Sequence, residues 1–163
     1  MIDLATERDE HRPAIERLLD AAFGEARWTK TCQRLRDGQQ AIRDLSLVAL
    51  DGDRLIGTVR LWPITVGRRS GLLLGPLAVD SSWRERTVGA RLMTEALGRA
   101  AAAGEDAVFL VGDAAYYRRF GFRPEPTRKL RLPGPVDRER FLACELKPGA
   151  TDGLIGDVLK RAA

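Results

Sequence analysis

The chain has 163 residues, of which 44% are hydrophobic and 31% are charged, a composition typical of globular proteins that excludes a disordered or fibrous chain. This length predicts one domain over residues 1–163, with a core over about 3–147 and a C-terminal extension over 148–163. The formal net charge is +4, but the arginines are interleaved with acidic residues and form no continuous basic block. The charge therefore suits a polyanionic small ligand, and we expect no nucleic-acid partner. The longest apolar runs are too short to cross a membrane, so no membrane partner is expected.

The cysteines and the histidine limit the chemistry of the chain. Cys32 and Cys144 lack CxxC spacing and follow no recognisable signal peptide, so we expect free thiols and a cytoplasmic location. His11 is the only histidine. This argues against a Ser-His-Asp or Cys-His triad and against a histidine-rich metal site, so no metal is expected.

Hydrophobic periodicity predicts one strand and two helices at the start of the chain. Residues 1–5 are short and apolar enough for an edge strand. A helix is expected over 12–23, where Pro13 suits the first turn and one face is apolar, at Ile15, Leu18, Leu19, Ala22 and Phe23. A weaker helix is expected over 27–36, with Trp28 as a packing side chain and Gly38 as its stop.

An antiparallel meander is predicted next. Strands are expected over 45–50, 55–66 and 71–79, with turns at Asp51-Gly52 and over 67–70. Gly75-Pro76 lies inside the third of these strands, where proline cannot donate to a sheet ladder. We expect a bulge or a splay there that leaves backbone groups of Leu77, Ala78 and Val79 free to bind a ligand.

In the second half of the chain, a helix is predicted over 87–103, a strand over 107–111 and a short helix over 114–120. An Arg- and Pro-rich loop is expected over 127–140, and a last clear strand over 141–146. Residues 149–163 fit either an extra strand or a helical tail. The strand that ends at Val79 leads through Arg84-Glu85-Arg86-Thr87-Val88-Gly89-Ala90 into the long helix. Free amides and the helix dipole would meet at this N-terminus, which predicts an anion-binding loop.

Three motifs in this order resemble the GNAT acetyltransferase superfamily. Residues 84–89 are similar to its pyrophosphate motif, Gln/Arg-x-x-Gly-x-Gly/Ala. Residues 112–122 are similar to the Gly-Asp-x-x-Tyr-Tyr-x-Arg-Phe-Gly-Phe signature of small predicted bacterial N-acetyltransferases, and residues 141–150 to the closing strand of that group. The resemblance implies an α/β (α+β) fold whose mixed, mostly antiparallel central sheet is splayed at its middle and has helices on both faces.

The same resemblance implies acetyl-CoA as co-substrate, held where two central strands splay apart. Leu77, Ala78 and Val79 would hydrogen-bond the pantetheine amides, and the backbone of Arg84, Glu85, Arg86, Thr87, Val88, Gly89 and Ala90 would wrap the pyrophosphate. It implies an N-acetyltransferase in which a primary amine attacks the thioester directly, so no protein nucleophile is required. The acceptor, a small-molecule or peptide amine that the sequence does not identify, would lie against residues 20–38 and 123–140. Homodimers are common in the superfamily.

Tyr117 is the candidate catalytic residue, because the family carries its presumed general acid four residues before the Gly-Phe pair, here Gly121-Phe122. A phenol of pKa about 10 stays protonated at neutral pH and can donate to a departing thiolate. Core packing is the alternative role for Tyr117 and the expected one for Tyr116. Three carboxylates are candidate bases by position, with water an equal alternative and none assigned: Asp113, Glu25 and Asp80.

Thr87 departs from the pyrophosphate motif, in which a glycine lets the backbone approach the phosphates without a Cβ in the way. Its hydroxyl could instead donate to a phosphate oxygen or cap the helix. Normal, weaker and lost cofactor binding are all compatible with this exchange. A non-catalytic acyl-CoA-binding sensor or interaction module of the same fold is therefore the alternative to an enzyme.

Overall fold

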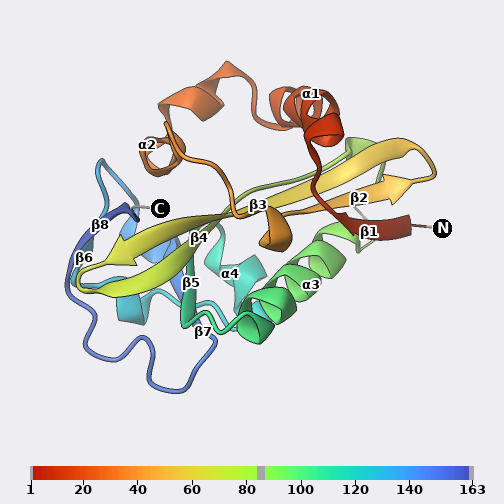
Figure 1. Ribbon diagram of the computed structural model, residues 1–163. Helices are drawn as coiled ribbons and strands as arrows, with labels where there is room; N and C mark the ends of the chain where they lie inside the picture. The colour runs from red at the N-terminus through yellow and green to blue at the C-terminus, as the bar shows by residue number, and fades with distance from the viewer. Residues whose placement is uncertain (1, 84–86, 162–163) are drawn as a thin grey trace.

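The structure, a computed structural model, describes residues 2–83 and 87–161, and these residues build one eight-stranded mixed sheet (Figure 1). The main path runs β1-β2-β3-β4-β5-β7, and only the β4–β5 pair within it is parallel. The strands on this path are β1 (Ile2–Thr6), β2 (Leu47–Asp51), β3 (Arg54–Val66), β4 (Arg69–Val79), β5 (Ala107–Val111) and β7 (Phe141–Glu145). The predicted mixed, mostly antiparallel sheet is therefore confirmed.

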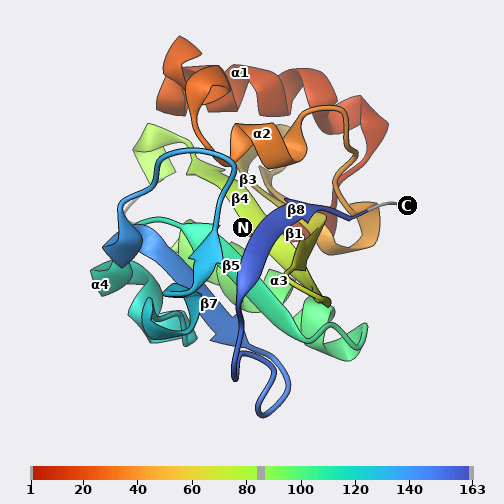
Figure 2. The same cartoon turned by 90° about the vertical axis from the view of Figure 1, so that its left-hand side faces the viewer.

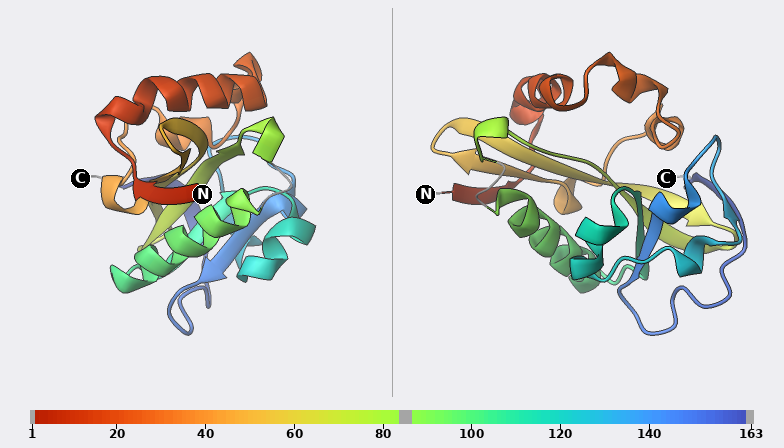
Figure 3. Two further views of the ribbon diagram at one scale, coloured as in Figure 1. Left: turned by 90° about the vertical axis from the view of Figure 1, so that its right-hand side faces the viewer. Right: turned by 180° about the vertical axis from the view of Figure 1, so that it is seen from behind.

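Helices cover both faces of the sheet, as predicted (Figure 3). The helices α1 (Arg12–Phe23) and α2 (Gln33–Arg36) lie on one face, and α3 (Val88–Ala102) and α4 (Ala114–Tyr117) lie on the other. The helix α1 buries Ile15, Leu18 and Leu19 against β2 and β4. The helix α3 packs an apolar face, including Leu92 and Met93, onto the opposite side of the meander. Two apolar layers thus hold the central strands between them.

The irregularity expected at Gly75-Pro76 is confirmed, both as a bulge and as a splay. In the register of β3 and β4, Val59 lies opposite Leu77, and the next paired residue of β3, Leu61, lies opposite Leu74. One residue of β3 therefore lies opposite two residues of β4, Gly75 and Pro76, which is a β-bulge. The strands β4 and β5 pair only at Leu72 and Leu73, and then diverge within the described structure. The edge of β4 beyond this point has backbone groups that no described strand takes up.

The segment before α2 differs from the single helix predicted over 27–36. It forms a short 3₁₀ turn, η2 (Glu25–Thr29), and then α2, with Lys30 in an extended conformation between them. The break has a physical cause, because the Arg27 side chain turns back to ion-pair with α1. The prediction of a continuous helix here was therefore wrong.

The C-terminal part also differs in detail from the prediction. Residues 156–160 form β8 (Gly156–Lys160), which pairs with the end of β3 at Ile64–Val66, so the strand alternative for this segment is confirmed. The strand β8 also pairs with β6 (Leu130–Arg131), which lies inside the predicted loop over 127–140. The helix α2 lies beside β8 (Figure 2). The predicted helix over 114–120 is α4 followed by a 3₁₀ turn over Arg118–Phe120.

Candidate active site

A cavity of about 890 Å³ opens where β4 and β5 diverge. One wall is the bulged stretch of β4 from Leu74 to Leu77, and the facing wall is the end of β5 with α4. The segment 27–36 and the loop around Pro135 close it from the other sides. Its size is that of a small-molecule or cofactor site, and it contains the unpaired edge of β4.

The end of β4 and the first turn of α3 lie next to each other beside this cavity. Leu77 lines the cavity, whereas Ala78 is buried against α1. A Cβ built on Gly89 would lie 3.6 Å from Cγ2 of Val79, which shows how closely the helix start approaches the strand. The structure thus brings together Leu77, Val79 and Gly89, three of the residues that the sequence predicted to bind acetyl-CoA.

The N-terminus of α3 is set by Thr87, which has φ 62° and ψ 14°. This is the left-handed region, and Thr87 is the only non-glycine residue with positive φ among the residues that the structure describes. A β-branched side chain there costs about 1–2 kcal/mol relative to a residue without a Cβ. The predicted contributions of Arg84, Glu85 and Arg86 lie outside the described residues. Val88 is the first residue of α3, and its side chain is buried in the core, so only its backbone is available to a ligand. Ala90 follows in the first turn of the helix.

Tyr117 lies at the end of α4 and lines the cavity. Its ring is held by Phe120 and Phe122, with centroids 6.4 and 6.0 Å away. A Cβ on Gly112 would come within 2.5 Å of its Cε2 atom, so the ring packs directly onto this glycine. Burial, with a smaller contribution from Tyr116, raises the pKa of Tyr117 to about 12. The phenol therefore keeps its proton across the whole neutral range and beyond.

Tyr116 is not the core side chain that the sequence predicted. It is only partly buried, lines the cavity, and lies with its hydroxyl 3.5 Å from the Cβ position of Gly89. The guanidinium of Arg119 covers its ring at 4.5 Å and donates to its carbonyl oxygen. Two tyrosines, rather than one, therefore line the cavity, and the Tyr116 hydroxyl is the one that lies close to the start of α3.

The three candidate bases are separated by the structure. Asp113 lines the cavity, while its carboxylate accepts a hydrogen bond from the Ala115 amide at 3.0 Å. Glu25 is exposed and does not line the cavity. Asp80 lies in a separate hollow between α1 and the β2–β3 hairpin, where hydrogen bonds from Ser82 lower its pKa. Asp137, which the sequence analysis did not single out, also lines the cavity.

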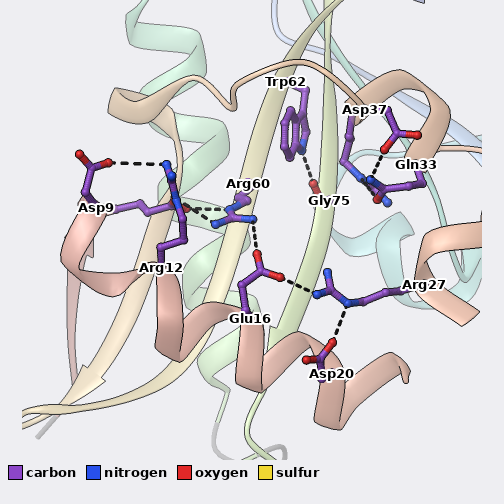
Figure 4. A network of polar contacts seen from close by, with 12 residues as sticks. Asp9, Arg12, Glu16, Asp20, Arg27, Gln33, Asp37, Arg60, Trp62 and Gly75 are labelled. Atoms are coloured by element: carbon purple, nitrogen blue, oxygen red, sulfur yellow. Dashed lines mark hydrogen bonds and ion pairs between the residues drawn. The ribbon is translucent and has the colours of Figure 1, made fainter. Parts of the chain in front are cut away.

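A chain of ion pairs holds the segment before α2 in place (Figure 4). Arg27 is only 8% exposed, and its guanidinium pairs with Glu16 at 2.5 Å and with Asp20 at 3.1 Å. Glu16 also lies 3.6 Å from Arg60, which is bound in turn by Glu7. These pairs connect β3, α1 and η2, and so fix one wall of the cavity. No periodic pattern marks them, because the partners come from distant parts of the chain.

Trp28 differs from its predicted role as a helix-packing residue. It is 53% exposed and lies outside the cavity lining. The Arg27 guanidinium stacks on its ring at 4.0 Å. Its aromatic ring therefore covers the buried ion pairs instead of filling the core.

Within residues 2–83 and 87–161, no cluster of three or more histidine, cysteine, aspartate or glutamate side chains could hold a metal ion. Within the same residues, every helix is too short or too polar to span a membrane. Cys32 and Cys144 are both free thiols, as predicted.

A model of the GNAT acetyltransferase domain matches residues 43–124. The chain belongs to the GNAT acetyltransferase family. It is 32% identical over 147 residues to the uncharacterized N-acetyltransferase YhbS of Escherichia coli (strain K12), covering 88% of this chain and 87% of that protein. The solved structure of E. coli YhbS in complex with CoA has a TM-score of 0.83 at 30% identity, with 98% of this chain and 89% of that chain covered. A GNAT family acetyltransferase from Brucella melitensis, in complex with acetyl-CoA, has a TM-score of 0.74 at 25% identity, covering 99% and 97% of the two chains.

Proposed function

We propose that this protein is an acetyl-CoA-dependent N-acetyltransferase that transfers the acetyl group to a primary amine by direct attack on the thioester. One observation carries the proposal: the bulged, unpaired edge of β4, the start of α3 and the Tyr117 phenol all border one cavity or its mouth. The complexes of YhbS with CoA and of the Brucella protein with acetyl-CoA support the choice of donor.

The residues present fit such a donor. The unpaired amides and carbonyls along Leu77 to Val79 suit the two amides of a pantetheine arm, which hydrogen-bond in the manner of an added strand. The fifteen-residue helix α3 presents its first amides and its positive dipole end beside them, which suits a pyrophosphate. Bound acetyl-CoA would supply an activated thioester, and no protein nucleophile is needed.

In the proposed reaction the acceptor nitrogen forms a bond to the carbonyl carbon while the carbon–sulfur bond breaks. A backbone amide near Leu77 donates to the carbonyl oxygen as negative charge develops on it. The Tyr117 hydroxyl gives its proton to the departing thiolate. The proton lost by the amine passes to solvent or to one of the cavity carboxylates, and solvent returns a proton to the tyrosinate before the next turnover. The pKa of about 12 keeps Tyr117 in the donating form.

The test is the release of free thiol from acetyl-CoA over a broad panel of primary amines, with product confirmed by mass spectrometry. Turnover that falls about 10²- to 10⁴-fold in Tyr117→Phe is the expected result, since general acid catalysis contributes that much. Full activity in this variant would remove Tyr117 as the acid. Binding of acetyl-CoA without turnover of any amine would favour the non-catalytic acyl-CoA-binding module instead.

A further inference from the structure

The cavity carries more positive than negative charge. Four cationic side chains line it, namely Arg27, Lys30, Arg36 and Arg140, against two carboxylates, Asp113 and Asp137. Each carboxylate accepts a hydrogen bond from a backbone amide at the start of a short helix, and the cations outnumber the carboxylates even with both of these charges counted. Positive charge therefore remains available to a ligand.

The four cations are not equivalent. Arg27 is neutralised by Glu16 and Asp20 in the buried network described above. Lys30 lies over the ring of Phe23, with Nζ 4.8 Å from its centroid. Across residues 2–83 and 87–161, no carboxylate comes within ion-pair distance of Lys30, Arg36 or Arg140.

Arg36 is the most informative of these side chains, because it is partly buried and crosses the bulge. Its Nη1 atom lies 3.5 Å from the Cβ position of Gly75. Its Nε donates weakly to Gln33 at 3.4 Å, and no described residue accepts from its two Nη groups. Burial lowers the pKa of Arg36, and the neighbouring Cys32 and Asp37 oppose this effect only in part. A guanidinium with free donors at a cavity wall is suited to a carboxylate or a phosphate.

The position of Arg36 separates it from the donor's phosphates. The helix α2 and the segment before it lie on the α1 face of the sheet, whereas the start of α3 lies on the other face (Figure 1). An anion at Arg36 therefore approaches the cavity from the side opposite the proposed pyrophosphate site. This is the side that remains for the acceptor.

We propose that Arg36, assisted by Lys30, binds an anionic group of the acceptor, so that the substrate is a small amine that also carries a carboxylate or a phosphate. The assignment of this anion to the acceptor rests on the proposed function. The cationic wall then orients the molecule with its anion on α2 and its amine towards the unpaired edge of β4. A neutral or purely cationic amine, such as a polyamine, would lack this anchor.

Calorimetric titrations of the full chain, saturated with CoA, test the proposal with matched probes. The pairs are alanine with alaninamide, γ-aminobutyrate with butylamine, and O-phosphoethanolamine with ethanolamine. In at least one pair we expect the anionic member to bind about ten- to hundred-fold more tightly, as one charged hydrogen-bonded contact provides. The pair that shows the difference identifies a carboxylate or a phosphate as the anion.

Variants then locate the contact. Arg36→Gln should abolish the preference and leave CoA affinity unchanged, whereas Arg36→Lys should retain part of it. Arg68→Gln, in the exposed β3–β4 turn, is the matched control and should change nothing. The proposal is overturned if no probe binds, if neutral and anionic members bind alike, or if Arg36→Gln weakens CoA binding instead. Acetylation is measured separately, so an Arg36-dependent anion preference without turnover of any amine in the broad panel would keep the anion site, contradict its assignment to an acceptor and contradict the proposed function.

Discussion

Replacing Gly112 by alanine would test the position of the Tyr117 hydroxyl without removing it. The added Cβ would lie 2.5 Å from Cε2 and 3.1 Å from Cδ2 of the ring. Since relaxed carbon–carbon contacts are about 3.5–4.0 Å, the ring must move by about 1 Å. Gly112 has no positive φ, so the alanine itself is compatible with the backbone and only the ring contact opposes it.

The expected effects have different sizes for stability and for rate. Overpacking costs about 1–3 kcal/mol, and the lower conformational entropy of the unfolded chain offsets about 0.4–1 kcal/mol of this, so the net loss in unfolding free energy is between about 0 and 2.6 kcal/mol. A misplacement of about 1 Å in a catalytic group costs about 10²-fold in rate. Urea denaturation measures the first, and kcat with an accepted amine measures the second. Gly98→Ala is the matched control, because Gly98 is exposed in α3 with open space around its Cβ position.

The double variant Gly112→Ala/Tyr117→Phe separates a displaced hydroxyl from a narrowed cavity. If the alanine acts only by moving the hydroxyl, its rate loss disappears when the hydroxyl is already absent, while its stability loss remains. Rate losses that multiply would refute this reasoning, because they would mean that the alanine acts on binding or on another group. A clear gain in the unfolding free energy of Gly112→Ala would refute the described ring contact itself.

Three further outcomes are expected. Thr58→Val should raise the unfolding free energy, measured by urea denaturation, by about 1 kcal/mol, because the fully buried Thr58 hydroxyl has no hydrogen-bond partner among the described residues. A loss of stability would show that the hydroxyl is hydrogen-bonded. Thr87→Gly should raise the unfolding free energy by about 0.5–1 kcal/mol, because the cost of the left-handed conformation is removed and exceeds the entropy that glycine adds to the unfolded chain. A clear decrease in unfolding free energy would show that the contacts of Thr87 outweigh its strain. Since Tyr117 stays protonated up to its pKa of about 12, kcat measured in a stopped assay should not fall between pH 8 and 10. A decline in kcat centred near pH 10 would contradict the raised pKa of Tyr117.

The parts of the fold that the sequence predicted are those controlled by local patterns. The helix α3 and the strands of the meander follow from hydrophobic periodicity, and the bulge follows from Gly75-Pro76, because proline cannot complete a ladder. The break between η2 and α2 has no such signal. It depends on Arg27 meeting Glu16 and Asp20 of α1, and only the folded chain brings them together.

The candidate site divides in the same way. Tyr117 could be proposed because the resemblance to the GNAT superfamily implies a general acid four residues before the Gly121-Phe122 pair, and both motifs lie in one short stretch of sequence. Arg36 and Asp137 were missed, since they come from segments about a hundred residues apart and meet only around the cavity. The one available signal was the concentration of basic residues in 27–36, which the sequence analysis assigned to a weak helix.

Thr87 shows how the structure changes the meaning of a departure from a motif. From the sequence, the missing glycine was a question about how closely the backbone approaches phosphates. The structure gives the position a second requirement, which is a positive φ at the residue before α3. A threonine meets it at a cost of about 1–2 kcal/mol. Because α3 begins directly after this turn, the first amides and the positive dipole end of the helix are still offered to an anion, and this favours the donor-binding hypothesis over a lost site.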